Sequence, residues 1–289
     1  MKILVTGHTG FIGSNMFNFL QKKKNVEPIG YSTSTGQDIF NINQLGRFLG
    51  GCDIVFHFAA YAKPGESIMK PVQAIESNVT GVLNVLEVCR KHDVPMVYSS
   101  SCEIYGGDSK SVLAEDCEMR PTNPYAISKV AADRICFGYW RTYSLNVKIV
   151  RLFNPYGPGQ QLNKIVPIFY KQAIQNKPIT VFGKGKDTRD YVFIDDIIRG
   201  LWMARDLKSG EAINLATGCE TSNLDMANLI IKLTGSKSKV NLVGYPKEFG
   251  NILNQVGSNK KAKKYIGWSP KISLENGVKK TINWLKRVI

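Results

Sequence analysis

The N-terminal segment places a glycine turn between a short apolar strand and an amphipathic helix. Residues 2–6 read KILVT, and the turn GHTGFIG follows at once, with glycines at 7, 10 and 13. In strand–turn–helix units that bind dinucleotides, the first glycine permits a tight turn, the second lets the backbone approach a pyrophosphate, and the third lets helix and strand pack closely. The spacing here is GxxGxxG rather than GxGxxG. The segment therefore predicts a nucleotide-binding unit at the start of the chain.

Strands and helices then alternate along the first half of the chain. Further strands are expected at VEPIGY, CDIVFHFAA, VPMVYSSS and NVKIVRLF, and helices at NQLGRFLG, KPVQAIESNVTGVLNVLEVCRKH and NPYAISKVAADRICFGYWRTYS. This alternation predicts an α/β protein with a doubly wound parallel sheet of the Rossmann type. Ligands of such sheets bind beyond the carboxyl ends of the strands, where Gly7, Ala59, Ser101 and Asn154 fall.

The length of the chain and its apolar pattern limit the possible domain organisation and cellular location. The 289 residues are enough for one large domain or two unequal lobes. No apolar run approaches the roughly 20 residues that cross a bilayer. The N-terminal MKILVTG also lacks the cleavage site of a signal peptide. We therefore expect a cytoplasmic protein with no membrane partner.

The formal charge of +15 comes partly from lysine runs at 22–24, 260–264 and 279–280. These runs lack interleaved aromatic residues and any DNA-reading motif, so they predict a solvated surface and no nucleic-acid partner. A basic balance still favours an anionic small molecule such as a diphosphate. The six cysteines and three histidines are scattered without ligand spacing, so no metal site is expected.

The tip of the second strand carries no carboxylate. In dinucleotide-binding units an acid at this place binds the ribose hydroxyls of NAD, whereas an arginine accommodates the phosphate of NADP. Here the tip reads Tyr31-Ser32-Thr33, which leaves both cofactors open, and Asp38-Ile39 in QDIFN is the expected clamp for the adenine ring.

Tyr125 and Lys129 in NPYAISK are four residues apart, so they share one face of a helix. A cationic lysine beside a tyrosine lowers the pKa of the phenol and can also hold the nicotinamide ribose. The phenolate can then take a proton from a hydroxyl as hydride leaves its carbon. Ser101, at the end of the neighbouring strand, would hydrogen-bond the same oxygen.

Motifs along the whole chain resemble those of one family. They read VTGHTGFIG, DIVFHFAA, NVTGVLNVLEVC, SSSCEIYG, NPYAISK, RLFNPYGPGQ, TRDYVFIDDIIRG, INLATG and KAKKYIGWSP. Together they resemble the extended short-chain dehydrogenase/reductase family, in its branch of nucleotide-sugar epimerases and dehydratases. The resemblance implies an enzyme that binds NAD, with NADP left open, and acts on a nucleotide-diphosphate sugar. It also implies a homodimer formed through the helices around 71–92 and 124–143.

The resemblance assigns residues to the two ligands. The residues expected at the cofactor are Gly7, Gly10, Phe11, Ile12, Gly13, Asp38, Ile39, Phe58, Ala59, Ala60, Tyr125, Lys129, Leu152 and Pro155. The residues expected at the substrate are Asn154, Val166, Phe182 and Arg189. Of these, Asn154 would contact the diphosphate and sugar, Phe182 the nucleobase, and Arg189 a phosphate. Phe182 has a competing interpretation as a core residue, and Arg189 as the partner of Asp187 or Asp190.

The same resemblance divides the chain into two parts. We expect a Rossmann domain of residues 1–153, rejoined by 191–216, and a smaller C-terminal substrate-binding lobe of 154–190 and 217–289. This lobe departs from the family, in which many members hold the second phosphate with an arginine ahead of the segment that matches NKKAKK. Here Lys247 is the only basic residue between 244 and 259, and the chain is short for the family. The sequence therefore does not identify the residue that binds the second phosphate of the substrate.

The segment YSSSCEIYGG distinguishes the reactions of this family, which all begin with hydride transfer from C4 of a hexose. In 4,6-dehydratases a glutamate stands at the place of Glu103 as the base for the C5 proton, and an acid stands at the place of Cys102. In 4-epimerases the glutamate place usually holds a small Thr or Ser. The Cys-Glu pair is similar to that of the tunicamycin-pathway UDP-GlcNAc dehydratase, which makes a 5,6-ene sugar. A thiol with a pKa of about 8.5 is mostly protonated at neutral pH and can serve as the acid.

We therefore expect C4 oxidation of an NDP-hexose, with UDP the favoured nucleotide, followed by elimination of water of the 4,6- or 5,6-dehydratase type. The expected catalytic residues are Ser101, Cys102, Glu103, Tyr125 and Lys129. The alternatives are a 4-epimerase, a 4-keto-sugar reductase or decarboxylase, and a non-catalytic protein that only binds the cofactor. The Ser101–Tyr125–Lys129 set argues against the last of these, because a binding module needs none of the three.

Overall fold

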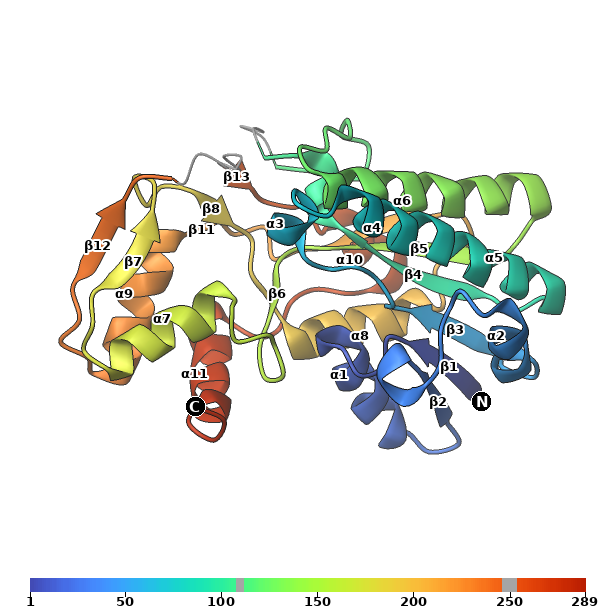
Figure 1. Cartoon of the computed structure of the whole chain (residues 1–289), viewed down its shortest axis with the longest axis horizontal. Coiled ribbons are helices and arrows are strands. Elements are labelled where there is room, and N and C mark those ends of the chain that lie inside the picture. The colour runs from blue at the N-terminus through green and yellow to red at the C-terminus, as the bar shows by residue number, and fades with distance from the viewer. Residues whose placement is uncertain (108–111, 246–253) are drawn as a thin grey trace.

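A parallel sheet of six strands forms the centre of the larger part of the molecule (Figure 1). The computed structural model describes residues 1–107, 112–245 and 254–289, so Lys247 lies outside the described residues. The strands, in sheet order, are β10 (Ala212–Leu215), β5 (Val147–Leu152), β4 (Met96–Ser101), β3 (Ile54–His57), β1 (Lys2–Thr6) and β2 (Glu27–Tyr31). Every neighbouring pair is parallel, which confirms the predicted doubly wound sheet. The chain switches direction across the sheet between β1 and β3, the place where such sheets open a ligand crevice.

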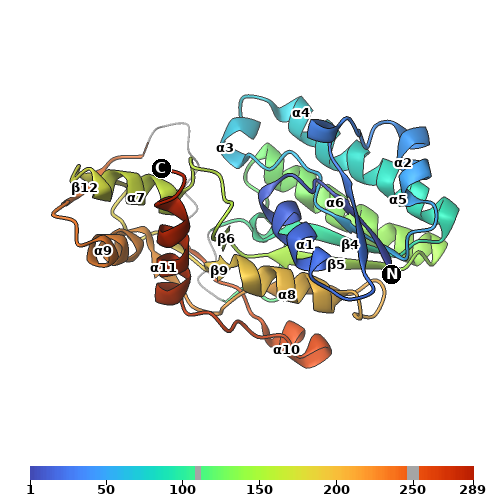
Figure 2. The ribbon, with the colours of Figure 1, turned by 90° about the horizontal axis from the view of Figure 1, so that it is seen from below.

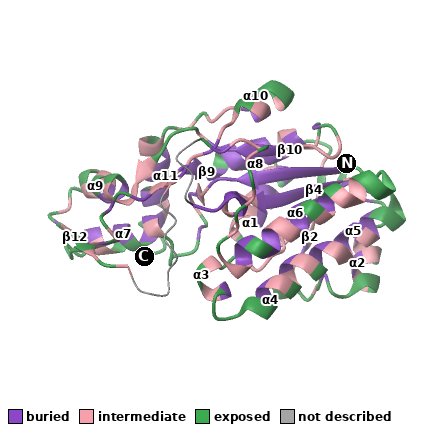
Figure 3. Cartoon of the chain, turned by 90° about the horizontal axis from the view of Figure 1, so that it is seen from above, coloured by how far each residue is buried: buried purple, intermediate pink, exposed green. Residues whose placement is uncertain are grey.

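Helices cover both faces of this sheet (Figure 2). On one face lie α1 (Phe11–Gln21) and α8 (Ile194–Ala204), and on the other lie α2 (Ile42–Leu49), α5 (Gly81–His92) and α6 (Pro124–Tyr143). All six residues of β5 are buried, as a strand covered on both faces requires. Figure 3 shows the buried strands between helices whose outer surfaces are exposed.

The helix predicted over 71–92 is interrupted by a wider turn. It consists of α4 (Pro71–Ile75), a π-helical turn η2 (Glu76–Thr80) and α5. Such turns are frequent at functional sites. Here the turn carries Asn78, whose carboxamide accepts from the Tyr61 backbone N–H at 2.7 Å and donates to Ser128 Oγ at 2.8 Å. Asn78 thereby fastens the loop that follows β3 to helix α6.

The smaller part of the molecule is built from helices and short strands (Figure 1). Its longer helices are α7 (Ile165–Ile174), α9 (Asn223–Thr234) and α11 (Leu274–Leu285). Its strands are β7 (Ile179–Phe182) beside β12 (Val240–Val243), and β8 (Thr188–Arg189) between β11 (Thr221–Ser222) and β13 (Asn254–Gln255). A further strand, β6 (Pro155–Tyr156), pairs with β9 (Val192–Phe193), which begins the segment that returns to the larger part. The remaining elements are η1 (Thr33–Thr35), α3 (Pro64–Ser67), η3 (Cys102–Tyr105) and α10 (Lys260–Ile266).

We propose the division expected from the sequence, with residues 191–216 rejoining the first domain, because α8 packs on the central sheet and β10 is its edge strand. One segment of the second part, α10, also lies against β10 at the edge of this sheet. Within the described ranges, no helix is long and apolar enough to span a membrane.

A buried polar network lies beneath the carboxyl end of β4. Asp133 on α6 accepts from Ser100 Oγ at 2.9 Å and from Arg151 Nε at 3.0 Å. Arg151 also donates to Tyr105 Oη at 2.7 Å, and Tyr105 donates to Asn214 Oδ1 at 2.8 Å. Asp133 and Arg151 are 0% and 1% exposed. The network therefore ties α6, β4, β5, η3 and β10 together directly under Ser101.

Candidate active site

A pocket of about 970 Å³ opens beyond the carboxyl ends of β1, β3, β4 and β5. All of the catalytic, cofactor and substrate residues predicted from the sequence line it, except Phe182. Phe182 ends β7 and is 45% exposed, so its competing interpretation as a core residue is wrong. The remaining predicted residues come from both parts of the molecule, so the pocket lies between them.

The glycine turn after β1 is shaped for close backbone approach. Gly7 has φ +67°, and a Cβ there would lie 2.7 Å from the backbone nitrogen of Ala59. A Cβ on Gly13 would lie 2.1 Å from the carbonyl oxygen of Gly7, so helix α1 could not pack this close. Helix α1 begins at the pocket, which is lined by Gly10, Phe11 and Ile12. The backbone N–H groups at this N-terminus favour binding of an anion. The turn fits the pyrophosphate of a dinucleotide.

The far end of this turn presents hydroxyl groups. Thr9 Oγ1 lies 2.8 Å from both Ser32 Oγ and Ser34 Oγ, which are 3.1 Å from each other. The Tyr31 hydroxyl donates to the carbonyl oxygen of Asp38 at 2.7 Å, which fixes the segment expected to clamp an adenine. A ribose in this part of the pocket would meet the hydroxyl cluster of Thr9, Ser32 and Ser34.

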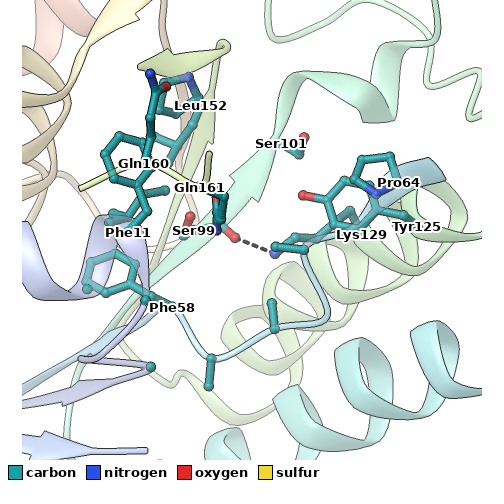
Figure 4. A pocket seen from close by; sticks show the side chains of 18 of the residues that line it. Phe11, Phe58, Pro64, Ser99, Ser101, Tyr125, Lys129, Leu152, Gln160 and Gln161 are labelled. Atoms are coloured by element: carbon teal, nitrogen blue, oxygen red, sulfur yellow. Dashed lines mark hydrogen bonds between the residues drawn. The ribbon is translucent and has the colours of Figure 1, made fainter. Parts of the chain in front are cut away.

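Ser101, Tyr125 and Lys129 meet at the end of β4. Ser101 is the last residue of that strand, and Tyr125 and Lys129 lie on the first turns of α6. Lys129 Nζ donates to the carbonyl oxygen of Ser99 at 2.7 Å, as Figure 4 shows, and the Tyr125 N–H donates to Ser67 Oγ at 3.1 Å. The three residues therefore face one space, although the sequence separates Ser101 from the other two.

The protonation of Tyr125 departs from the sequence-based expectation. Burial raises the pKa of Tyr125, and the Glu103 carboxylate raises it further, whereas hydrogen bonding to Ser101 lowers it. Lys129 was expected to lower this pKa, but its ammonium group is bonded to Ser99 and to the Tyr98 hydroxyl at 3.2 Å. Burial lowers the pKa of Lys129 itself to about 8. Burial and Glu103 therefore favour the protonated phenol, and hydrogen bonding to Ser101 opposes them.

Cys102 and Glu103 follow Ser101 on the turn η3 and line the same pocket. Burial, with the nearby Glu103 carboxylate, raises the pKa of the Cys102 thiol to about 12, so the thiol stays protonated at neutral pH. Burial also raises the pKa of Glu103, and a hydrogen bond from Asn123 opposes this effect. The Asn123 Nδ2–Glu103 Oε2 distance is 3.0 Å, and Ser101 Oγ accepts from the Glu103 N–H at 3.2 Å. The pocket therefore holds a protonated thiol beside a fixed carboxyl group.

Asn154 and Arg189 approach this pair from the other side of the pocket. Asn154 has a positive φ of +23°, and its Nδ2 donates to the carbonyl oxygen of Asp190 at 3.2 Å and lies 4.0 Å from Cys102 Sγ. The Asp190 carboxylate accepts from the backbone N–H groups of residues 217, 218 and 257. The guanidinium group of Arg189 lowers the pKa of both Glu103 and Asp187, against the effect of burial on each. Arg189 thus brings positive charge to the side of the pocket that faces Glu103.

Several residues of the site were missed from the sequence. Asn123 stands before the proline that begins α6, and an asparagine there is a recognisable helix N-cap. Lys164 precedes α7, lines the pocket and lowers the pKa of Glu103. Asn78, which does not line the pocket, marks the π-helical turn that was also missed. Only the capping position of Asn123 carries a local signal, because the other two depend on contacts between distant segments.

A family model described as "NAD dependent epimerase/dehydratase family" matches residues 3–216. The chain is 30% identical to the UDP-glucuronate 4-epimerase of Thermodesulfobacterium geofontis, across 99% of this chain and 96% of that protein. It is also 30% identical to the dTDP-D-glucose 4,6-dehydratase of Dictyostelium discoideum, across 99% of this chain and 81% of that protein. The solved UDP-glucuronic acid 4-epimerase of Bacillus cereus, in complex with UDP-glucuronic acid and NAD, is similar with a TM-score of 0.92 and 28% identity over 100% of both chains. Nucleotide-sugar decarboxylases are also among the relatives.

Proposed function

Because the chain belongs to the NAD-dependent epimerase/dehydratase family, we propose that it oxidises C4 of a UDP-hexose and then eliminates water from the oxidised sugar. Its relatives include an epimerase and a dehydratase at the same identity, so overall similarity does not choose between the two reactions. The observation that carries the proposal is local: the buried thiol of Cys102 and the carboxyl group of Glu103 follow Ser101 into the pocket.

The cofactor of this proposal is NAD, which is bound in the similar Bacillus cereus structure. The glycine turn and α1 would hold its pyrophosphate, and Tyr31 to Ile39 its adenosine. When bound, NAD supplies the acceptor for hydride from C4 and returns that hydride later in the cycle. The residues proposed to contact it are Gly7, Gly10, Phe11, Ile12, Gly13, Asp38, Ile39, Phe58, Ala59, Ala60, Tyr125, Lys129, Leu152 and Pro155.

The first step needs a base at O4 of the sugar. Balance requires Tyr125 to be a phenolate when the step begins, and hydrogen bonding to Ser101 favours that form against the effect of burial. The phenolate would take the O4 proton as C4 gives up its hydride. Lys129, held by the Ser99 carbonyl, is placed to hold a ribose hydroxyl beside Tyr125. The product of this step is a 4-keto sugar whose C5 proton is acidified by the carbonyl group.

The second step uses the two residues after Ser101. Glu103 would take the C5 proton, and the electron pair of the C5–H bond forms the C5=C6 double bond as the C6–O bond breaks. Cys102 would give its proton to the leaving hydroxyl, which departs as water. Balance requires Cys102 to be protonated and Glu103 to be ionised when the step begins. The raised pKa of the thiol meets the first requirement, and the N–H donor of Asn123 favours the second.

We propose that the substrate diphosphate lies toward Arg189, with Asn154 and Val166 at the sugar. The guanidinium fork of Arg189 suits a phosphate. Lys164 adds a second positive charge at this side of the pocket. Phe182 remains the proposed contact for the nucleobase, although it lies outside the pocket lining. UDP is the nucleotide that we expect, and a homodimer and a cytoplasmic location stay predictions.

The direct test is incubation with a panel of UDP-, GDP-, CDP- and dTDP-sugars followed by mass spectrometry of the products. A product lighter than its substrate by the mass of one water supports the proposal. A product of unchanged mass with a new retention time would show a 4-epimerase instead. A matched Glu103→Gln variant separates the steps, because it should lose water elimination while still oxidising C4 slowly.

A further inference from the structure

Asn123 joins the two catalytic segments through one side chain. It precedes α6 in an extended conformation, and its Oδ1 accepts from the Ala126 N–H at 2.8 Å, which caps the helix that carries Tyr125. Its Nδ2 donates to Glu103 Oε2 at 3.0 Å. A single carboxamide therefore contacts both the first turn of α6 and the carboxyl group on η3.

The surroundings of Glu103 make its hydrogen bond with Asn123 important for the ionisation of the carboxyl group. Burial favours the neutral acid, and Asn123 is the leading group among those that oppose burial. The other charged or titratable groups that act there are Arg189 on β8, Lys164 before α7, Cys102 on η3 and Tyr125 on α6. Both cations lie near the proposed substrate diphosphate, which would compete for their charge. Asn123 is neutral and is fixed at the helix cap, so its contact with Glu103 does not depend on such competition.

We propose that Asn123 is a positioning residue for the elimination step, which holds the Glu103 carboxylate ionised and aimed at C5. The inference rests on the proposed function. The Oδ1 atom of Asn123 accepts the capping hydrogen bond of α6, so only the amide N–H of Asn123 can face Glu103. The position of Glu103 is therefore set by the same helix N-terminus that positions Tyr125. The Asn123 side chain would thus position Tyr125, the base of the first step, and Glu103, the base of the second.

Two substitutions keep the cap and change only the second contact. Serine and aspartate both cap helices well. Asn123→Ser removes the amide donor, and Asn123→Asp places an anion in its position. Asn41→Ser is the matched control, because Asn41 caps α2 by the same bond, to the Gln44 N–H at 3.0 Å, and does not line the pocket.

The readouts separate positioning from folding. Solvent deuterium exchange at C5 and C4 oxidation are measured against pH with UDP-glucose and UDP-N-acetylglucosamine, and the Glu103 carboxyl is titrated by ¹³C NMR without substrate. Loss of a hydrogen bond to a charged group should raise the pKa of Glu103 by about one unit in Asn123→Ser, and more in Asn123→Asp. The acid limb of C5 exchange should move to higher pH by the same amount. C4 oxidation, cofactor affinity and the melting temperature should match those of Asn41→Ser.

Each contrary result has a distinct meaning. An unchanged Glu103 titration and exchange profile in both Asn123 variants would overturn the inference while leaving the proposed function intact. A parallel loss of C4 oxidation and C5 exchange would also overturn it, because that result marks a merely structural cap. Absence of C5 exchange in the wild-type enzyme at every pH would refute the proposed elimination itself, and this inference with it.

Discussion

Replacing Asp133 by Asn should destabilise the protein strongly, although Asp133 does not line the pocket. Asp133 and Arg151 are both buried and are joined by contacts of 3.0 and 3.1 Å. Removing the charge of one member of a buried pair leaves the other uncompensated, which costs about 3–5 kcal/mol. For a chain of this size such a loss corresponds to a drop in melting temperature of about 6 °C or more. Urea unfolding followed by circular dichroism measures the free energy, and calorimetry measures the temperature.

The sign of the pH dependence follows from the direction of the pKa shift. Burial alone would raise the pKa of Asp133, but the bonds from Arg151 and Arg134 outweigh burial and lower it. The stabilisation is therefore present above the unfolded pKa of about 3.9 and is lost as pH falls through the folded pKa. The difference between wild type and Asp133→Asn should accordingly shrink in acid.

Two controls test the physical reasoning. Arg134 also contacts Asp133, at 2.6 Å, but its side chain is 49% exposed, so Arg134→Gln should cost less than about 1 kcal/mol. The double variant Asp133→Leu/Arg151→Met removes both charges together and should recover part of the stability lost in Asp133→Asn. The reasoning fails if Asp133→Asn costs no more than Arg134→Gln, or if the double variant is less stable than Asp133→Asn.

Three further outcomes are expected. Tyr125→Phe should lower turnover by about a hundredfold or more, because it removes a general base, while NAD affinity measured by calorimetry persists; normal turnover would disprove the assignment. Gly13→Ala should weaken NAD binding and lower the melting temperature, since its Cβ would lie 2.1 Å from the Gly7 oxygen, and an unaffected variant would show that α1 packs differently. Ser32→Asp should reduce NADP affinity more than NAD affinity, because a carboxylate repels a 2′-phosphate; equal losses would place the ribose elsewhere.

The parts of the fold and site that the sequence predicts are those with local signals. The glycines at 7, 10 and 13 sit directly between a strand and a helix, and the spacing of Tyr125 and Lys129 defines one helix face. Ser101 was placed because strand ends of a parallel sheet share one edge, and all of these residues line the pocket.

What the sequence does not predict depends on desolvation and on contacts between distant segments. Lys129 was expected to lower the pKa of Tyr125, yet its ammonium group donates to the Ser99 carbonyl oxygen, and burial has the largest effect on the pKa of the phenol. The bond from Asn123 to Glu103 spans twenty residues, and its existence requires that η3 and the start of α6 meet. The π-helical turn around Asn78 lies inside a regular helical pattern, so periodicity alone could not locate it.

The most direct test of the account is the fate of deuterium placed at C5 of the UDP-sugar that the panel shows to be converted. The wild-type enzyme is expected to release this label to water as the 4-keto sugar forms and loses water. The Glu103→Gln variant is expected to retain the label although C4 oxidation continues. Retention of the label by the wild-type enzyme, in a product of unchanged mass, would contradict the proposed role of Glu103 and establish epimerisation.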